Sequence, residues 1–270
     1  MDLEFFVETP PWDWPQDAGE TFQKALTDKK VEESKRIIAA ELAGDPAAIN
    51  DTLAATLLEV IGDGTEPEEL RTRAAISLGP ALDEADIGDY DDPDDPPAIS
   101  QSMFGNIQET LHKLYLDPRT PKQVQRRILE AAVRAPEAWH KDAIRTSYAS
   151  GDREWLLTAI FAMRFVKGFD REILEALKNP DPEIHTEAVQ AAGNWEVDAA
   201  WPHVKRLIQD KRTPKPLLLA AIGAAGDIRP SQAGELLKDL ADSGDEDIAE
   251  AVEEAILMAS GSEDVDDEFD

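Results

Sequence analysis

A short Ala-rich pattern recurs along the second half of the chain at nearly constant spacing. Each copy centres on an Ala followed by Val or Ile, and the copies lie 29, 33 and 30 residues apart: Ala159-Ile160, Ala188-Val189, Ala221-Ile222 and Ala251-Val252. Fainter copies lie upstream, at 37–46, 73–82 and 129–138. A period of about 30 residues is typical of repeat proteins, in which one supersecondary unit is stacked many times. The pattern therefore predicts a stack of similar units.

Within each unit, two helical segments are expected. The Ala-rich segment has high helix propensity and apolar spacing near 3.6, and a second amphipathic segment follows it at 170–179, 199–208 and 231–240. Sustained alternation of apolar and polar residues, the mark of strands, is absent from the sequence. We predict an all-α fold, an α-solenoid (superhelix) of about six helix pairs near 31–63, 66–117, 120–152, 153–181, 182–210 and 213–245, with a capping helix at 246–260.

Several segments resemble those of HEAT-repeat proteins. The resemblance lies in "AAELAGD", "LRTRAAISLGPAL" and "AAGNWEVDAAWPHV", and it covers about residues 30–260. The units are most similar to the short bacterial HEAT repeats of phycobilisome-lyase-like proteins. This resemblance implies a helical solenoid that binds other macromolecules along an extended surface. A few such solenoids are enzymes, so the resemblance alone does not assign an activity.

Irregular segments define the expected domain boundaries. Residues 1–30 are predicted to form an N-terminal cap in which Trp12 and Trp14, in an extended segment, pack on the first repeat. Residues 31–260 form the repeat domain, interrupted by an Asp- and Pro-rich loop at 83–98, and 261–270 form an acidic disordered tail. The tetrapeptide RTPK occurs at 119–122 and 212–215, each time after an Asp, and is interpreted as a linker with a helix start.

The charge balance restricts the partners. The chain has 57 acidic and 27 basic side chains and a formal net charge of −30. A surface this negative repels nucleic acid and anionic membranes, so neither is an expected partner. There are no cysteines, no apolar run long enough to cross a bilayer and no secretory signal, and we expect a cytoplasmic protein, taken as a monomer.

A local basic stretch stands out against this acidity. Between 119 and 145 the basic residues outnumber the acidic ones, and six of them form a candidate basic patch: Arg119, Lys122, Arg126, Arg127, Arg134 and Lys141. The acidic loop at 83–98 precedes this stretch, and one hypothesis is that the loop shields it. The alternative is that these side chains lie on a solvated helix face and pair locally.

Catalytic and metal motifs are not found in the sequence. The four histidines show no H-x-x-x-H or H-E-x-x-H spacing, and there is no nucleophile elbow, P-loop or dinucleotide fingerprint. Deoxyhypusine hydroxylases, which are also built of HEAT-like repeats, carry His-Glu pairs as iron ligands, whereas no His here precedes a Glu. We therefore expect no catalytic residues, no metal and no resident cofactor.

The central units carry the expected partner contacts. Aromatic and Arg side chains dominate binding energy at protein interfaces, and the region 139–205 combines them with Lys and His. The predicted contacts are Trp139, Arg145, Tyr148, Arg164, Lys167, Trp195, Trp201, His203 and Lys205. The predicted function is a non-catalytic scaffold or adaptor that binds a protein or peptide on the concave face of the solenoid. The alternative is an accessory protein, similar to bilin lyases, that handles a cofactor in the same groove.

Overall fold

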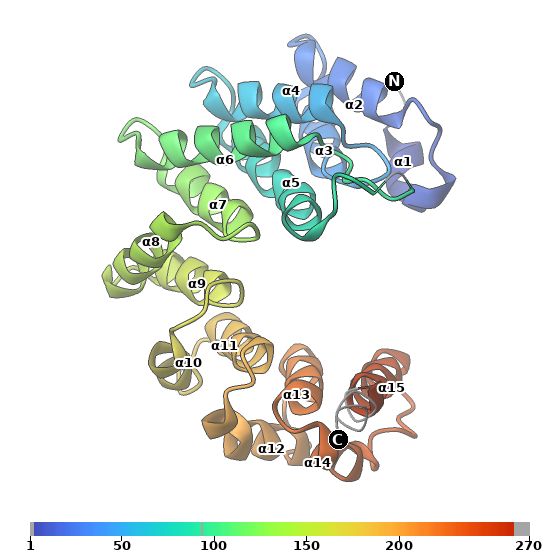
Figure 1. Cartoon of the computed structure of the whole chain (residues 1–270), viewed down its shortest axis with the longest axis vertical. Helices are drawn as coiled ribbons and strands as arrows, with labels where there is room; N and C mark the ends of the chain where they lie inside the picture. The colour runs from blue at the N-terminus through green and yellow to red at the C-terminus, as the bar shows by residue number, and fades with distance from the viewer. Residues whose placement is uncertain (1–2, 93, 262–270) are drawn as a thin grey trace. The chain divides into compact units, whose positions relative to one another are not determined.

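All regular secondary structure in the described part of the chain is helical. The computed structural model describes residues 3–92 and 94–261. Those ranges contain fifteen α-helices, two short 3-10 helices and no β-strand (Figure 1). The predicted all-α class is confirmed, and the fold is an α-solenoid of paired helices. Of the predicted acidic tail at 261–270, all but the first residue lie outside the described residues.

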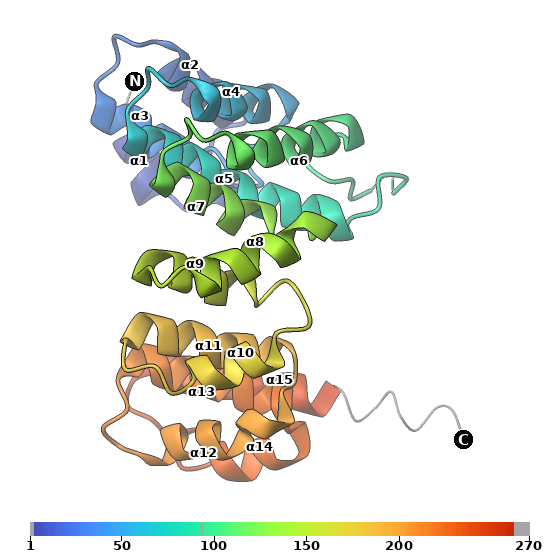
Figure 2. The same cartoon turned by 90° about the vertical axis from the view of Figure 1, so that its left-hand side faces the viewer.

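The chain divides into two compact units, 1–140 and 141–270, called unit 1 and unit 2. Unit 1 consists of α1 (Glu4–Glu8), η1 (Pro11–Asp13), α2 (Ala18–Thr27), α3 (Glu33–Leu42), α4 (Asp51–Gly62), α5 (Glu68–Ile87), α6 (Gln101–Leu116) and α7 (Lys122–Ala132). Helices α2, α4 and α6 are successive neighbours in one layer, and α3, α5 and α7 form the other (Figures 1 and 2).

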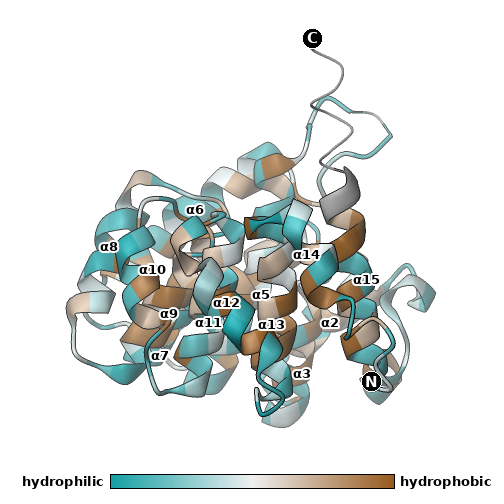
Figure 3. Cartoon of the chain, turned by 90° about the horizontal axis from the view of Figure 1, so that it is seen from below, coloured by the Kyte–Doolittle hydropathy of each residue, from teal (hydrophilic) through white to brown (hydrophobic). Residues whose placement is uncertain are grey.

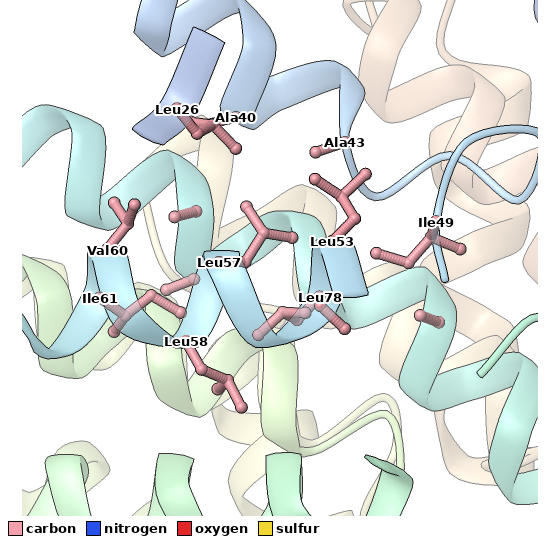
Figure 4. Close-up of a cluster of buried hydrophobic side chains, with 14 of the residues drawn as sticks. Leu26, Ala40, Ala43, Ile49, Leu53, Leu57, Leu58, Val60, Ile61 and Leu78 are labelled. Atoms are coloured by element: carbon pink, nitrogen blue, oxygen red, sulfur yellow. The ribbon is translucent and has the colours of Figure 1, made fainter. Parts of the chain in front are cut away.

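The apolar core of unit 1 lies between these two layers (Figure 4). Leu53, Leu57 and Ile61 recur every four residues along α4, and each is at most 1% exposed. They pack with Leu78 of α5 and with apolar residues of α2 and α3. Burying each such side chain stabilises the fold by roughly 1.5–3 kcal/mol before the entropy cost of folding. The apolar spacing therefore fixes which face of α4 points inward.

Unit 2 repeats the same arrangement. Helix α8 (Ala138–Ala149) crosses the division, and the following elements are α9 (Arg153–Ala162), α10 (Asp170–Ala176), α11 (Pro182–Asn194), η2 (Asp198–Ala200), α12 (Trp201–Gln209), α13 (Lys215–Ile228), α14 (Pro230–Leu237) and α15 (Glu246–Gly261). Helices α9, α11, α13 and α15 form one layer, on which α10, α12 and α14 pack. Figure 3 shows both apolar and polar residues along helices such as α13 and α15, as amphipathic packing requires.

The Ala-rich repeats all fall in one layer of each unit. In unit 2 they lie on α9, α11, α13 and α15, and in unit 1 on α3, α5 and α7. The Ala-Ile or Ala-Val pairs of α9, α11 and α13 are fully buried. Close helix approach explains the small side chains: a Cβ added at Gly193 of α11 would lie 2.9 Å from the Cα of Ala224 on α13. The prediction that these segments are helical is confirmed, although the copies at 37–46 and 129–138 extend past the ends of α3 and α7.

Hydrogen bonds from polar side chains to backbone carbonyls join the helix pairs of unit 1, and these residues were not identified from the sequence. The fourth residue of α3, α5 and α7 donates to the carbonyl ten positions earlier, at the end of the preceding helix: Arg36 to Leu26 (2.7 Å), Arg71 to Ile61 (2.8 Å) and Gln125 to Tyr115 (3.0 Å). Helix ends leave such carbonyls without partners. The first two donors are 35 residues apart and the last two 54 apart, so the insertion in this unit amounts to 19 residues.

Most of this insertion follows α5. Helix α5 continues to Ile87, so the first residues of the predicted loop are helical, and the next helix, α6, begins at Gln101. The connection is anchored at its end, where Asp51 accepts hydrogen bonds from the Ser100 amide (2.7 Å) and hydroxyl (2.6 Å), and Ile99 is buried. Asp83, the first residue of the predicted loop, lies in α5 at 4.0 Å from Arg134, whereas none of the described residues of 88–97 forms an ion pair with the basic stretch 119–145. Apart from this one contact, the described residues give no support for shielding.

Both RTPK copies form the same local structure. Asp117 accepts a hydrogen bond from the Arg119 amide (2.9 Å) and pairs with its guanidinium (2.7 Å), and Asp210 does the same with Arg212 (3.0 Å and 3.0 Å). The Arg119 guanidinium lowers the pKa of Asp117 to about 2. The proline of each copy is the N-cap of the next helix, α7 or α13. The interpretation of RTPK as a linker with a helix start is confirmed.

The two N-terminal tryptophans differ. Trp14 packs edge-on against Phe6 and Phe22, and its indole donates to the Thr9 carbonyl at 2.8 Å. Trp12, by contrast, is 82% exposed. Trp14 thus packs within the predicted cap, against side chains of α1 and α2, while Trp12 does not pack as predicted. The segment is not extended throughout, because Trp12 lies in the 3-10 helix η1.

Candidate functional site

The nine predicted partner contacts lie in different places. Trp139 belongs to unit 1, where it stacks on His112 with ring centroids 4.5 Å apart and packs against the core cluster. The other eight belong to unit 2. There they form three groups: Arg145 and Tyr148 on α8; Arg164, Lys167 and Trp195 after α9 and α11; and Trp201, His203 and Lys205 on α12.

The first group contacts α10 and the segment before it. The Arg145 guanidinium lies 5.9 Å from the centre of the Phe169 ring, and Arg145 also pairs with Asp142 at 3.1 Å. The Tyr148 hydroxyl donates to Glu175 at 3.1 Å. Burial, followed by this carboxylate, raises the pKa of Tyr148 to about 12. Tyr148 is therefore a neutral hydrogen-bond donor at any physiological pH.

The second group joins neighbouring repeats at the C-terminal ends of α9 and α11. The Trp195 indole donates to the Met163 carbonyl at 2.6 Å, and Lys167 lies over the Trp195 ring at 5.7 Å. Arg164 lies over the ring of Phe161 at 5.4 Å and pairs with Glu187 at 3.2 Å. Because Trp195 satisfies a carbonyl at the end of α9, it is a structural link between repeats as well as a half-exposed aromatic.

The third group includes a pair of histidines that sequence spacing could not reveal. The Nε2 atoms of His185 on α11 and His203 on α12 are 2.7 Å apart. Arg206 donates to Nδ1 of His203 at 2.7 Å, so the proton of His203 is on Nε2 and is donated to His185. Burial, His185 and Arg206 lower the pKa of His203 to about 4, and burial lowers that of His185. Both rings are neutral near pH 7 and act as a fixed contact between helices.

A groove between α12 and α14 contains the two other members of this group. It has a volume of about 950 Å³. Trp201, Lys205 and Ile208 line it from α12, and Gln232, Glu235 and Leu236 line it from α14. Trp201 is 7% exposed and lies beneath Arg229, which pairs with Asp198 at 2.8 Å. Volumes of this size suit a bound ligand or a peptide segment.

The six residues of the candidate basic patch do not form one open surface. Arg126 is 4% exposed and donates to Gln123 at 2.7 Å, while Arg127 pairs with Glu130. Arg119 pairs within its own turn, and Arg134 lies 4.0 Å from Asp83. Lys122 is half-buried, and Lys141 is exposed on the unit 2 side of the division. Local pairing, the alternative considered for these residues, accounts for most of them.

Unit 1 has a separate pocket of about 710 Å³. The N-terminal segment, including Phe6 and Trp14, forms one wall, and Leu42 at the end of α3 forms another. Arg73 of α5 and Arg134 line it as well. Arg73 pairs with Glu41 at 3.2 Å, so the basic side chains of this pocket already have acidic neighbours.

Neither pocket carries a metal-binding arrangement. Across 3–92 and 94–261, no group of three or more His, Asp or Glu side chains is placed to hold a metal ion. Within the same ranges, no helix is both long enough and apolar enough to cross a membrane. The α12–α14 groove brings charged side chains of two adjacent helices together beside the largely buried Trp201.

Comparison with known proteins supports the repeat architecture. No curated protein matches the chain. Among solved structures, human deoxyhypusine hydroxylase in complex with glycerol is 18% identical, covering 93% of this chain and 87% of that one, with a TM-score of 0.42. An engineered protein is 19% identical, covering 92% and 98%, with a TM-score of 0.35. Residues 171–256, from α10 into α15, match the family model of HEAT repeats.

Proposed function

We propose that the protein is a non-catalytic scaffold that binds a protein or peptide partner through unit 2. The observation that carries this proposal is the α12–α14 groove, which brings Trp201 and Lys205 together on one surface. HEAT-type helix pairs are a common framework for such surfaces, because stacked helices present side chains along an extended face. The proposal includes a cytoplasmic location, a monomer, and no nucleic-acid partner.

The other predicted contacts support this surface indirectly. Trp195 and the His185–His203 pair fix α11 against α9 and α12, and Arg229 holds Trp201 in place. A pre-organised surface loses less entropy on binding than a flexible one. We therefore assign direct partner contact to Lys205 and its neighbours in the groove, and a positioning role to Trp195 and His203.

Reversing two charges at the groove should strongly weaken partner capture. In Lys205→Glu with Lys211→Glu, two exposed lysines at the groove become acidic, and we expect retention of the partner from native lysate to fall by roughly tenfold or more. The matched control is Arg171→Glu with Lys178→Glu, which makes the same change in charge at exposed residues of the α10 region.

Comparing the two variants distinguishes a loss of binding at the groove from a general effect of the protein's net charge. Capture that survives the groove variant, or that is lost equally in the α10 control, would contradict the assignment. Far-UV circular dichroism of both variants should match the wild type, because all four side chains are exposed.

A second candidate function rests on the unit 1 pocket. Its aromatic wall and its two arginines, Arg73 and Arg134, are the residue types that would bind a pigment bearing carboxylates. This second proposal includes the resemblance to phycobilisome-lyase-like proteins of bacteria. It places the pigment in the unit 1 pocket, whereas the sequence-based alternative placed it in the same groove as the partner. Absorbance and mass spectrometry of protein purified from its native host test it: a retained pigment would support it, and colourless, ligand-free protein would favour the scaffold.

A further inference from the structure

The charges around the α12–α14 groove differ from those of the rest of the molecule. Between 205 and 215 the sequence KRLIQDKRTPK has five basic residues and one acidic residue, in a chain whose net charge is −30. Two of the five, Lys205 and Lys211, line the groove. In contrast, Arg206 donates a hydrogen bond to His203, and Arg212 forms an ion pair with Asp210. The basic stretch thus places two of its lysines at the groove.

These two lysines have no acidic partner among residues 3–92 and 94–261. Neither Lys205 nor Lys211 forms an ion pair with a described residue, and both are exposed. On the opposite wall, Lys238 pairs with Glu235 at 2.5 Å, and Asp239 follows it. Charge is therefore distributed unevenly: the α12 side is basic and uncompensated, while the α14 side is mixed.

The groove also has an apolar surface between its charged walls. Trp201 and Ile208 on α12 are 7% and 8% exposed, and Leu236 and Leu240 on the opposite wall are half-buried. The walls are helices of nine and eight residues, so the groove is about 12–14 Å long. That length suits two turns of a helix or about four residues of extended chain.

From these observations we propose that the groove binds an acidic, amphipathic segment of a partner protein. Carboxylates of this segment would pair with Lys205 and Lys211, and an apolar side chain would cover Leu236 and Leu240. The inference rests on the proposed function and adds the chemistry of the partner. A uniform polyanion fits less well, because Glu235 and Asp239 on the second wall would repel it.

The test uses the full chain and a synthetic probe. The probe is a fluorescein-labelled helical peptide of about twelve residues, with Leu at i, i+3, i+4 and i+7 and Glu at most other positions. Fluorescence anisotropy should show saturable binding that weakens as salt rises. Lys205→Glu with Lys211→Glu should weaken binding by roughly tenfold or more, while Arg171→Glu with Lys178→Glu should leave it unchanged.

Two altered probes test the two parts of the proposal. A peptide with Gln in place of every Glu should bind at least roughly tenfold more weakly, and so should a peptide with Ser in place of every Leu. Equal binding of the Gln peptide would overturn the acidic assignment. Heparin that competes as well as the peptide would also overturn it, by showing that only bulk negative charge is recognised.

A last experiment tests whether acidic residues of the chain itself bind in the groove. Replacing the six carboxylates within 262–270 by their amides in the full chain should leave probe affinity unchanged. A marked gain in affinity would assign the groove to this segment of the chain and overturn the partner assignment. The groove variant could lose capture of the native partner while the Gln peptide binds the wild type as tightly as the Glu peptide does. That result would support the proposed scaffold function and would refute the proposal that the partner segment is acidic.

Discussion

Replacing Arg36 with Met should lower the free energy of unfolding of the protein by about 3 kcal/mol. Arg36 is 5% exposed and contacts Glu66 through two nitrogens, at 2.6 and 3.0 Å, while a further bond reaches the Leu26 carbonyl. Its loss leaves Glu66 buried with Lys29 as its remaining basic partner, and leaves the end of α2 without its donor. Urea unfolding followed by circular dichroism measures the change.

A double variant separates the ion pair from the volume of the side chain. With Arg36→Met and Glu66→Leu together, the uncompensated carboxylate is gone, and most of the lost stability should return. If the double variant were as unstable as Arg36→Met, the loss of stability would not be caused by the unpaired carboxylate of Glu66.

The Arg36–Glu66 ion pair should also make the stability of the protein depend on pH in the acidic range. Hydrogen bonds from Arg36, and then Lys29, lower the pKa of Glu66 below its ordinary value of 4.5. Because the folded pKa is lowered, the stabilisation is present above pH 4.5 and is lost as the pH falls through the folded pKa. The difference in the free energy of unfolding between the wild type and Arg36→Met should therefore become smaller at acidic pH.

Replacing Gly44 with Ala should cost about 3 kcal/mol, since no side chain fits at this position. Gly44 follows α3, and a Cβ there would lie 1.8 Å from the carbonyl oxygen of Ser77 on α5. The obstacle is backbone, so α3 and α5 would have to separate. Gly62→Ala at the end of α4 is the control, because a Cβ there meets nothing within 4 Å.

The control has the opposite expected sign. Ala restricts the unfolded chain more than Gly, so Gly62→Ala should raise stability by up to about 1 kcal/mol. If Gly44→Ala and Gly62→Ala had equal effects in urea unfolding, the close approach of α3 and α5 would be refuted.

The helices were predictable because their signal is local and repeated. Ala188-Val189 and Ala221-Ile222 lie on a helical apolar face, and that spacing alone indicates buried helices. Arg36, Arg71 and Gln125 were missed because a polar residue on an apolar face resembles an interruption until its carbonyl partner is known. Their common position, the fourth of each helix, is the signal that would have identified them.

The candidate site was predictable only in part. Trp201 and Lys205 were identified by residue type, and both line the α12–α14 groove. Its other wall, including Gln232 and Leu236, follows a separate helix whose packing against α12 no local pattern specifies. The basic stretch at 205–215 was visible in the sequence but was overlooked in favour of 119–145, where most of the arginines pair locally.

Covalent capture at the groove tests whether a partner binds between α12 and α14. A photo-crosslinking residue in place of Gln232, which is exposed on the groove, should form an adduct with a protein partner on irradiation in native lysate. The same residue in place of Lys178, exposed near α10, should not. Adducts of equal yield from both positions, or a partner that co-purifies yet never crosslinks from position 232, would show that the partner does not bind in the groove.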